Sequence, residues 1–217
     1  MSIQDNLFQI KSSLPPDVTL VAVSKTKPVA DLMEAYNAGQ RIFGENKIQE
    51  MAEKHEVLPK DIKWHMIGHV QSNKVKYMAP FVDLIHGVDS LKLLAEIDKQ
   101  GKKHDRVIDC LLQIYIANEE SKFGLDENEL NELLASPIYL NLKNIKVIGL
   151  MGMATFTDNQ SQIRKEFQSL KTLFDKHKKL NPHFSVLSTG MSGDYKIAIE
   201  CGSTMVRIGS SIFGERS

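Results

Sequence analysis

The chain has 217 residues, in which 27 basic and 27 acidic side chains cancel to a formal net charge of zero. Proteins that bind nucleic acid usually carry a basic excess or a dense basic face, so we expect no nucleic acid as a partner. No apolar run approaches the roughly 20 residues of a membrane span, and Cys110 and Cys201 belong to no paired motif. The first 14 residues also lack the cationic start of a signal peptide. We therefore expect a cytoplasmic protein without membrane contact.

Strand and helix patterns alternate along the chain, after an amphipathic N-terminal helix with Ile3, Leu7 and Ile10 on one face. We predict strands over 20–24, 41–45, 63–68, 83–89, 106–116, 145–153, 184–190 and 205–209. We predict helices over 28–39, 47–57, 72–78, 90–100, 127–134, around 163–174 and over 194–201.

The strands are near-continuous apolar runs, which is typical of parallel strands buried on both faces. Alternation of strand and helix implies right-handed parallel connections. Eight such units in about 200 residues suit a single (β/α)₈ TIM-type barrel better than an open sheet. No linker or change in composition divides the chain, so we predict one α/β domain over residues 1–217.

Unusual polar and small residues follow the predicted strands. Active sites of such barrels lie at the carboxyl ends of the strands, so these residues should converge in space. They are Ser24 to Thr26, Gly44 to Asn46, Gly68 to Asn73, Gly152 to Thr155, Ser188 to Gly193 and Arg207 to Ser211.

Lys25 directly follows the first strand. Most lysines are solvated, and a surface position is the ordinary interpretation. At the rim of a barrel, however, desolvation would lower the pKa of its amine and make it nucleophilic. A neutral amine can then form a Schiff base with a carbonyl compound. Its position favours Lys25 over Lys27, which we expect at the exterior or the rim.

Arg207 interrupts the apolar run of the last strand. It is either one half of a buried ion pair or a fixed cation that faces a ligand. The small residues after the seventh and eighth strands resemble a phosphate-binding loop, because small side chains let backbone N–H groups approach an anion. Loops of this composition are also common as simple turns.

His65 and His69 have the four-residue spacing of zinc ligands on helices. Here they lie on a strand, where four residues span about 13 Å. No cysteine pair or carboxylate accompanies them, so we assign no metal site.

Five motifs carry a resemblance to a known family: AVSKTKP, IFGENKIQE, WHMIGHVQSNK, GLMGMATF and STGMSGDYKIAIECGSTMVRIGSSIFGER. In this order and over nearly the whole chain, they resemble the YggS/PROSC family of pyridoxal 5'-phosphate (PLP) homeostasis proteins. The family fold is a single barrel like the N-terminal domain of alanine racemase. The chain departs from the family pattern at Thr189, where methionine is common, and at Gly193, where an acid is common.

The resemblance implies that Lys25 binds PLP as a Schiff base and that Arg207 meets the pyridine nitrogen. It further implies a phosphate site made by Met191, Ser192, Gly209 and Ser210, with Asn46 near the ring and His69 near the mouth. Because arginine keeps its proton, the pyridine nitrogen would stay unprotonated. That weakens the ring as an electron sink, on which most PLP catalysis depends.

We therefore expect a protein of vitamin B6 metabolism that stores and delivers PLP, with little or no catalysis. The family's racemase relatives use a second domain and a partner subunit to supply a catalytic tyrosine, and we expect no room for that domain in this chain. Its partners would be PLP and, transiently, PLP-dependent apo-enzymes, and we expect a monomer.

Two alternatives stay open. One is a weak PLP-dependent amino-acid racemase, with His69 or Tyr195 as base, although loop packing and a helix surface explain these residues as well. The other is a Schiff-base aldolase that uses Lys25 without PLP and binds a sugar phosphate. The sequence also leaves open whether Lys27 or Lys122 binds PLP transiently.

Overall fold

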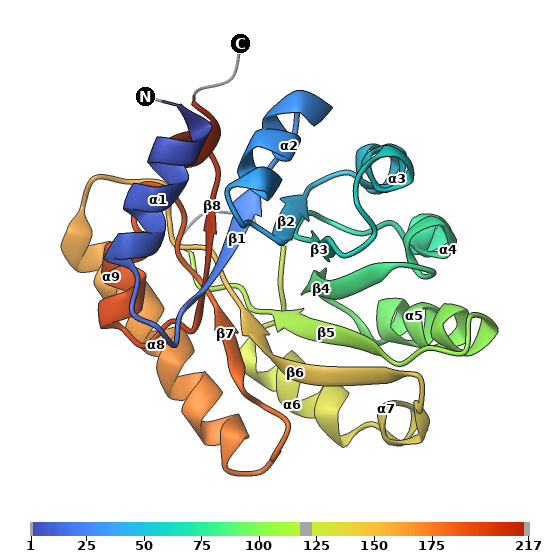
Figure 1. The fold of residues 1–217 in the computed structure, drawn as a ribbon. Coiled ribbons are helices and arrows are strands. Elements are labelled where there is room, and N and C mark those ends of the chain that lie inside the picture. Colours follow the sequence, from blue (N-terminus) through green and yellow to red (C-terminus); the bar gives the residue numbers. More distant parts are fainter. Residues whose placement is uncertain (1, 118–122, 215–217) are drawn as a thin grey trace.

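The alternating strands and helices form a closed barrel of eight parallel strands in the computed structural model, which describes residues 2–117 and 123–214 (Figure 1). Each strand pairs with the next in chain order, and β8 pairs with β1 to close the barrel. The prediction of a (β/α)₈ barrel is confirmed. The strands are β1 Thr19–Val23, β2 Ile42–Glu45, β3 Lys63–Met66, β4 Val82–Val88, β5 Ile108–Gln113, β6 Ile145–Met151, β7 Val186–Ser188 and β8 Met205–Ile208.

The helices form a ring outside the strands (Figure 1). The N-terminal helix α1 packs beside α10, where the Asn6 side chain donates a hydrogen bond to the Ile212 carbonyl at 3.0 Å. A capping box of Ser2 and Asp5 begins α1. The helices are α1 Ile3–Ser13, α2 Val29–Asn37, α3 Ile48–Val57, the 3₁₀ turn η1 Ser72–Lys74, α4 Val75–Met78, α5 Leu91–Lys103, α6 Glu127–Ala135, α7 Pro137–Asn141, α8 Gln160–Lys178, α9 Tyr195–Glu200 and α10 Ser210–Phe213.

The structure differs from the sequence-based elements in detail. The predicted strands 106–116 and 184–190 are shorter, because only Ile108–Gln113 and Val186–Ser188 pair continuously with their neighbours. Helix α7 was not predicted. Its start carries ordinary signals, because Ser136 caps the helix and Pro137 occupies its first turn.

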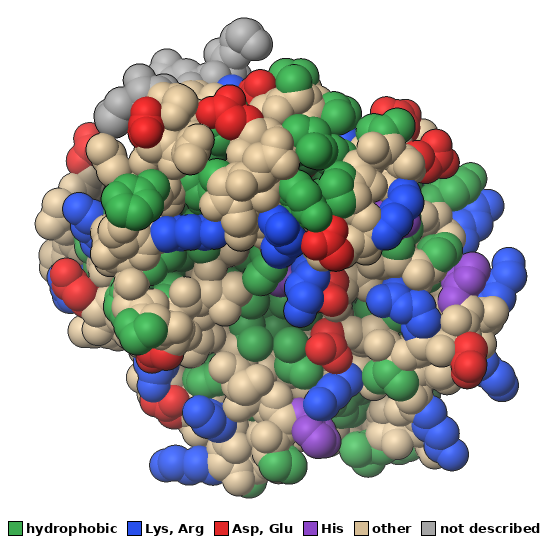
Figure 2. Space-filling view, in the orientation of Figure 1, with side chains coloured by type: hydrophobic (Ala, Val, Ile, Leu, Met, Phe, Trp, Pro, Cys, Tyr) green, Lys and Arg blue, Asp and Glu red, His purple; other side chains and the backbone are tan. Residues whose placement is uncertain are grey.

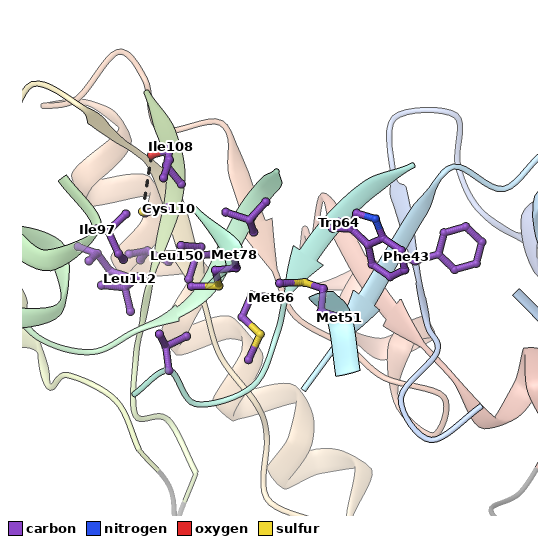
Figure 3. Packing of buried hydrophobic residues seen from close by; sticks show 14 of the residues in the cluster. Phe43, Met51, Trp64, Met66, Met78, Ile97, Ile108, Cys110, Leu112 and Leu150 are labelled. Carbon is purple, nitrogen blue, oxygen red and sulfur yellow. Dashed lines mark hydrogen bonds between the residues drawn. The ribbon is translucent and has the colours of Figure 1, made fainter. Parts of the chain in front are cut away.

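Two apolar layers hold the barrel together. The larger lies between the strands and the helices, where Phe43, Trp64 and Met51 are fully buried (Figure 3). Cys110 lies in the same layer and its thiol donates to the Ile108 carbonyl (Figure 3), which confirms it as a core residue. The smaller layer fills the barrel interior with side chains from separate strands: Val21, Leu84, Leu111, Met151 and Met205. Polar residues at interior positions therefore stand out against an apolar background.

The surface agrees with the neutral composition. On the face shown in Figure 2, basic and acidic side chains are interspersed, and neither sign gathers into one large patch. Within residues 2–117 and 123–214, no helix is long and apolar enough to span a lipid bilayer.

Candidate functional site at the barrel mouth

A cavity of about 510 Å³ opens at the carboxyl ends of the strands. Its walls come from segments that follow β1, β2, β3, β6, β7 and β8. Seven of the eight predicted cofactor contacts line it: Lys25, Asn46, Met191, Ser192, Arg207, Gly209 and Ser210. A second cavity of about 380 Å³ lies by the starts of β1 and β2, and none of these residues lines it. The structure therefore brings together residues that are up to 185 positions apart in the sequence.

His69 does not line this cavity. Its side chain is about half exposed, its Nδ1 lies 3.6 Å from a carboxylate oxygen of Asp89, and its ring stacks on Phe123 with centroids 4.7 Å apart. Tyr195 is buried, and its hydroxyl lies 3.5 Å from the Ser13 hydroxyl of α1. Neither of the two candidate bases therefore faces the cavity.

Lys25 is partly buried in the wall of the cavity, so the ordinary interpretation as a surface lysine does not hold. It begins a turn in which Thr26 has a φ of +65°. A positive φ is rare for a β-branched residue and is retained only where the surroundings impose it. Here the Thr26 N–H donates to the Glu50 carboxylate at 2.6 Å. Lys27 also lines the cavity, but its ammonium donates to the Phe213 carbonyl at 2.9 Å.

A buried ammonium fixes this turn from the outside of the barrel wall. Lys54 of α3 donates three hydrogen bonds of 2.8 Å, to the Ser24 carbonyl and to the carboxylates of Glu45 and Glu50. The Ser24 hydroxyl donates to the same Glu45 oxygen at 2.6 Å. We call these four residues the Lys54 clamp. It joins α3 to the ends of β1 and β2, directly before Lys25.

The Lys54 clamp holds ionisable groups in a buried environment, where charge is costly. Burial raises the pKa of Glu45, while hydrogen bonding and attraction from Lys54 act in the opposite direction. The second Glu45 oxygen, Oε2, is buried and has no hydrogen-bond partner among the described residues. Since an uncompensated buried charge is costly, Glu45 depends on Lys54 as its counterion.

Arg207 reaches the cavity from the interior of β8 and is almost fully buried. Among the described residues no carboxylate forms an ion pair with it, and its hydrogen bonds go to neutral oxygens instead. Its guanidinium donates to the Ser188 carbonyl at 2.9 Å, to the Ser188 hydroxyl at 2.7 Å and to the Gly152 carbonyl at 3.2 Å. Burial lowers the pKa of Arg207 to about 10, although Asp194 acts to raise it. Arg207 therefore remains a cation at neutral pH.

The loops after β7 and β8 form the opposite wall. Gly190 has a φ of +97°, and a Cβ there would lie 2.6 Å from the Ala198 Cβ, so only glycine suits this turn. The Asp194 carboxylate accepts from the Met191 N–H at 2.6 Å, and the Gly209 N–H donates to the Ser192 hydroxyl at 3.3 Å. At Gly209 a Cβ would lie 3.1 Å from the Val23 carbonyl. The two loops are thus joined to each other at the cavity.

Comparison with known proteins identifies the family. The family model for the N-terminal domain of alanine racemase matches residues 1–217. The chain is 41% identical to a pyridoxal phosphate homeostasis protein of Aquifex aeolicus, over 91% of this chain and 86% of that one. The equivalent protein of Vibrio alginolyticus is also 41% identical, over 99% of this chain and 98% of that one. The chain belongs to the pyridoxal phosphate homeostasis protein family.

Solved structures of this family agree with the fold. PipY of Synechococcus elongatus, determined with PLP bound, superposes with a TM-score of 0.90 at 34% identity. The superposition covers 98% of this chain and all of PipY. The family resemblance inferred from the five sequence motifs is therefore confirmed.

Sequence reasoning missed the residues that support the cavity of this family member. Lys54 follows Ile48 and Met51 at steps of three on α3, and this spacing was a signal that it faces the core. His86 interrupts an apolar strand as Arg207 does.

Lys122, the other candidate for transient PLP binding, lies outside the described residues. Across the described ranges, no group of three histidine, cysteine or acidic side chains is arranged to hold a metal.

Proposed function

We propose that the protein binds PLP at the mouth of the barrel, on Lys25, and that it stores and delivers this cofactor in the cytoplasm with little or no catalysis. It would do so as a monomer, with the barrel as its one PLP-binding domain. The names of relatives that match nearly the whole chain support this, as does PipY, whose structure was determined with PLP bound. The observation that carries the proposal is the convergence of Lys25 and Arg207 on one cavity.

The residues present fit PLP in size and in chemistry. The cavity of about 510 Å³ lies in the usual range for small-molecule sites, roughly 300–1,000 Å³. When bound, PLP supplies an aldehyde that a lysine amine captures as a Schiff base, together with a pyridine ring and a phosphate. Lys25 would hold the aldehyde carbon, Arg207 the ring nitrogen and Asn46 one side of the ring. Met191, Ser192, Gly209 and Ser210 would surround the phosphate.

The charges around the cavity favour a carrier over a catalyst. Arg207 cannot give up a proton to the ring nitrogen, so the ring would be a weak electron sink. A racemase needs a base on each face of the substrate, and neither His69 nor Tyr195 lines the cavity. Within residues 2–117 and 123–214, the other ionisable residues that line it are Lys27, Asp158 and Asp194. No observation favours a racemase over a carrier.

The test compares the wild type with Lys25→Ala and Lys27→Ala after incubation with PLP. We expect a visible absorption band in the wild type and in Lys27→Ala, and its loss in Lys25→Ala. Reduction with borohydride followed by peptide mapping should attach the cofactor to Lys25. Lys27→Ala is the matched control, because both lysines line the same cavity.

A wild type that stays colourless with excess PLP would refute the proposed function and would favour the aldolase alternative. The non-catalytic part is tested separately, by incubating the loaded protein with L- and D-alanine. Steady interconversion of the two enantiomers that Lys25→Ala abolishes would establish the racemase alternative.

A further inference from the structure

A chain of hydrogen bonds crosses the apolar interior of the barrel, starting at Arg207. The Ser188 hydroxyl accepts from Arg207 at 2.7 Å and lies 3.0 Å from His86 Nδ1. His86 Nε2 lies 3.0 Å from His65 Nδ1. The far side of the His65 ring, Nε2, lies 3.5 Å from the Asp83 carboxylate. Ser188, His86 and His65 are all buried, whereas the Asp83 side chain is 45% exposed.

The two ends fix the direction of this chain. Arginine only donates hydrogen bonds, and an ionised carboxylate only accepts them. Ser188 therefore accepts from Arg207 and donates to His86 Nδ1. His86 Nε2–H then donates to His65 Nδ1, and His65 Nε2–H points to Asp83. Both histidines are neutral Nε2–H tautomers in this arrangement, and the reverse orientation would set a bare ring nitrogen against the carboxylate.

The surroundings keep both rings neutral. Burial lowers the pKa of His65, against the influence of Asp83, and Lys63 lowers it further. Burial also lowers the pKa of His86, and His65 and Arg207 add to this effect. The pKa of Asp83 is lowered mainly by His65, with smaller contributions from Lys63 and Arg106, so its carboxylate is ionised at neutral pH.

An irregularity in β4 determines where Asp83, the acidic end of this series of hydrogen bonds, lies. Trp64 pairs with Val82 and His65 pairs with Leu84, so Asp83 has no partner in β3. In a regular strand, side chains point alternately to the two faces of the sheet, and a bulge changes the direction of a side chain relative to this alternation. Here it leaves Asp83 within reach of the interior residue His65 while the carboxylate stays open to water.

We propose that Ser188, His86 and His65 are positioning residues for Arg207, which they hold in one orientation at the floor of the cavity. This inference rests on the proposed function, in which Arg207 meets the pyridine nitrogen of PLP. The physical basis is the alignment of the hydrogen bonds. In this series of hydrogen bonds, every acceptor lone pair points toward the Arg207 guanidinium and every donor hydrogen points toward Asp83. The dipoles of Ser188, His86 and His65 therefore complement the positive charge at one end and the negative charge at the other.

Arg207 has no carboxylate in contact among the described residues, and it needs such acceptors in an interior otherwise filled by Val21, Leu84 and Met205. Because Arg207 keeps its proton, the hydrogen bonds from Ser188 to Asp83 hold the cation in place and do not conduct protons to the cofactor.

Isotope-edited nitrogen NMR of the wild type without PLP tests the chain directly. We expect both His65 and His86 as neutral Nε2–H tautomers at neutral pH. An Nδ1–H tautomer or an imidazolium at either histidine at neutral pH would overturn the inference. This measurement depends neither on cofactor binding nor on the folding of a variant.

The positioning role is tested with PLP in Ser188→Ala, with Thr189→Val as the matched control. Thr189 is the neighbouring buried residue, and within the part of the chain that the structure describes its hydroxyl has no hydrogen-bond partner. We expect Ser188→Ala to weaken PLP binding by about 10-fold and to shift the absorption maximum of the bound cofactor, while Thr189→Val does neither.

The outcomes separate the two proposals. If the wild type binds PLP and Ser188→Ala matches it in affinity and spectrum, the positioning role is refuted and the proposed function stands. If the wild type binds no PLP, the proposed function fails and the positioning role fails with it. If Ser188→Ala does not fold, His86→Gln takes its place, and an unchanged spectrum in that variant equally refutes the role.

Discussion

Replacing Lys54 with methionine tests the clamp that supports Lys25. Methionine keeps an unbranched side chain of similar length, has a sulfur in place of one methylene and lacks the ammonium. The change takes away three hydrogen bonds of 2.8 Å, to the Ser24 carbonyl and to the carboxylates of Glu45 and Glu50. It leaves Glu45 fully buried, and among the residues that the structure describes one carboxylate oxygen has no partner and the other is held only by the Ser24 hydroxyl.

The expected loss is large because one partner of a buried pair remains. The Lys54 and Glu45 side chains are 7% and 0% exposed, so water cannot replace the lost ammonium. Breaking such a pair usually costs about 3–5 kcal/mol of unfolding free energy. Replacing Glu45 by glutamine as well removes the stranded charge. We therefore expect the double variant Lys54→Met/Glu45→Gln to be more stable than Lys54→Met alone.

The loss should also depend on pH. Burial raises the pKa of Glu45, and Lys54 is the main influence that opposes this, so the pKa rises further in Lys54→Met. A carboxyl whose pKa is higher in the folded state than in the unfolded chain binds its proton more tightly when folded. Stability then increases as the pH falls through the folded pKa toward the unfolded value. The deficit of Lys54→Met should therefore shrink as the pH falls from neutral toward the unfolded pKa of glutamate, about 4.3.

Urea denaturation of the wild type and the variants, across this pH range, measures all three effects. Glu53→Gln is a suitable control, because it removes an exposed carboxylate from the same helix. A loss below about 1 kcal/mol in Lys54→Met, or a double variant no more stable than the single one, would refute the electrostatic reasoning.

Two further predictions concern the barrel itself. A Cβ on Gly149 would lie 1.7 Å from the Val186 carbonyl oxygen, so Gly149→Ala should lower the unfolding free energy by at least about 3 kcal/mol. Gly193→Ala is the control: a Cβ there has no atom within 4 Å, and its unfolding free energy should stay within about 0.5 kcal/mol of the wild type. Equal melting temperatures of the two variants would contradict this prediction. His65 lowers the pKa of Asp83, so this carboxylate stabilises the fold above its unfolded pKa and loses that contribution as the pH falls through the folded pKa. The unfolding free energy of Asp83→Asn should therefore fall less than that of the wild type in acid, and parallel curves from urea titrations would exclude the effect.

The parts of the fold that sequence reasoning predicted well depend on local pattern. Runs of apolar residues identified all eight strands, because strands buried on both faces have no polar side. Lys25 and Arg207 were found because a charged residue at the end of, or within, such a run is conspicuous. Their convergence followed from the closed topology alone, since parallel strands end on the same side of a barrel.

The supporting residues could not be predicted in the same way, because they depend on which strand positions meet across the interior. His65 and Ser188 belong to strands that are not neighbours, and His86 of β4 connects them across the barrel interior. His69 stays a prediction. A position after β3 suggested the mouth of the barrel, yet its ring packs against Phe123 outside the cavity.

The cavity has two polar supports that work from opposite sides of the barrel wall. The Lys54 clamp lies between the wall and α3 and holds the turn that carries Lys25. The hydrogen-bonded chain that ends at Asp83 lies inside and holds Arg207. A carrier must hold its ligand reversibly, so the lysine and the arginine need fixed positions more than they need reactive neighbours. Substitutions in either support should therefore change the affinity for PLP, although they replace none of the residues that line the cavity.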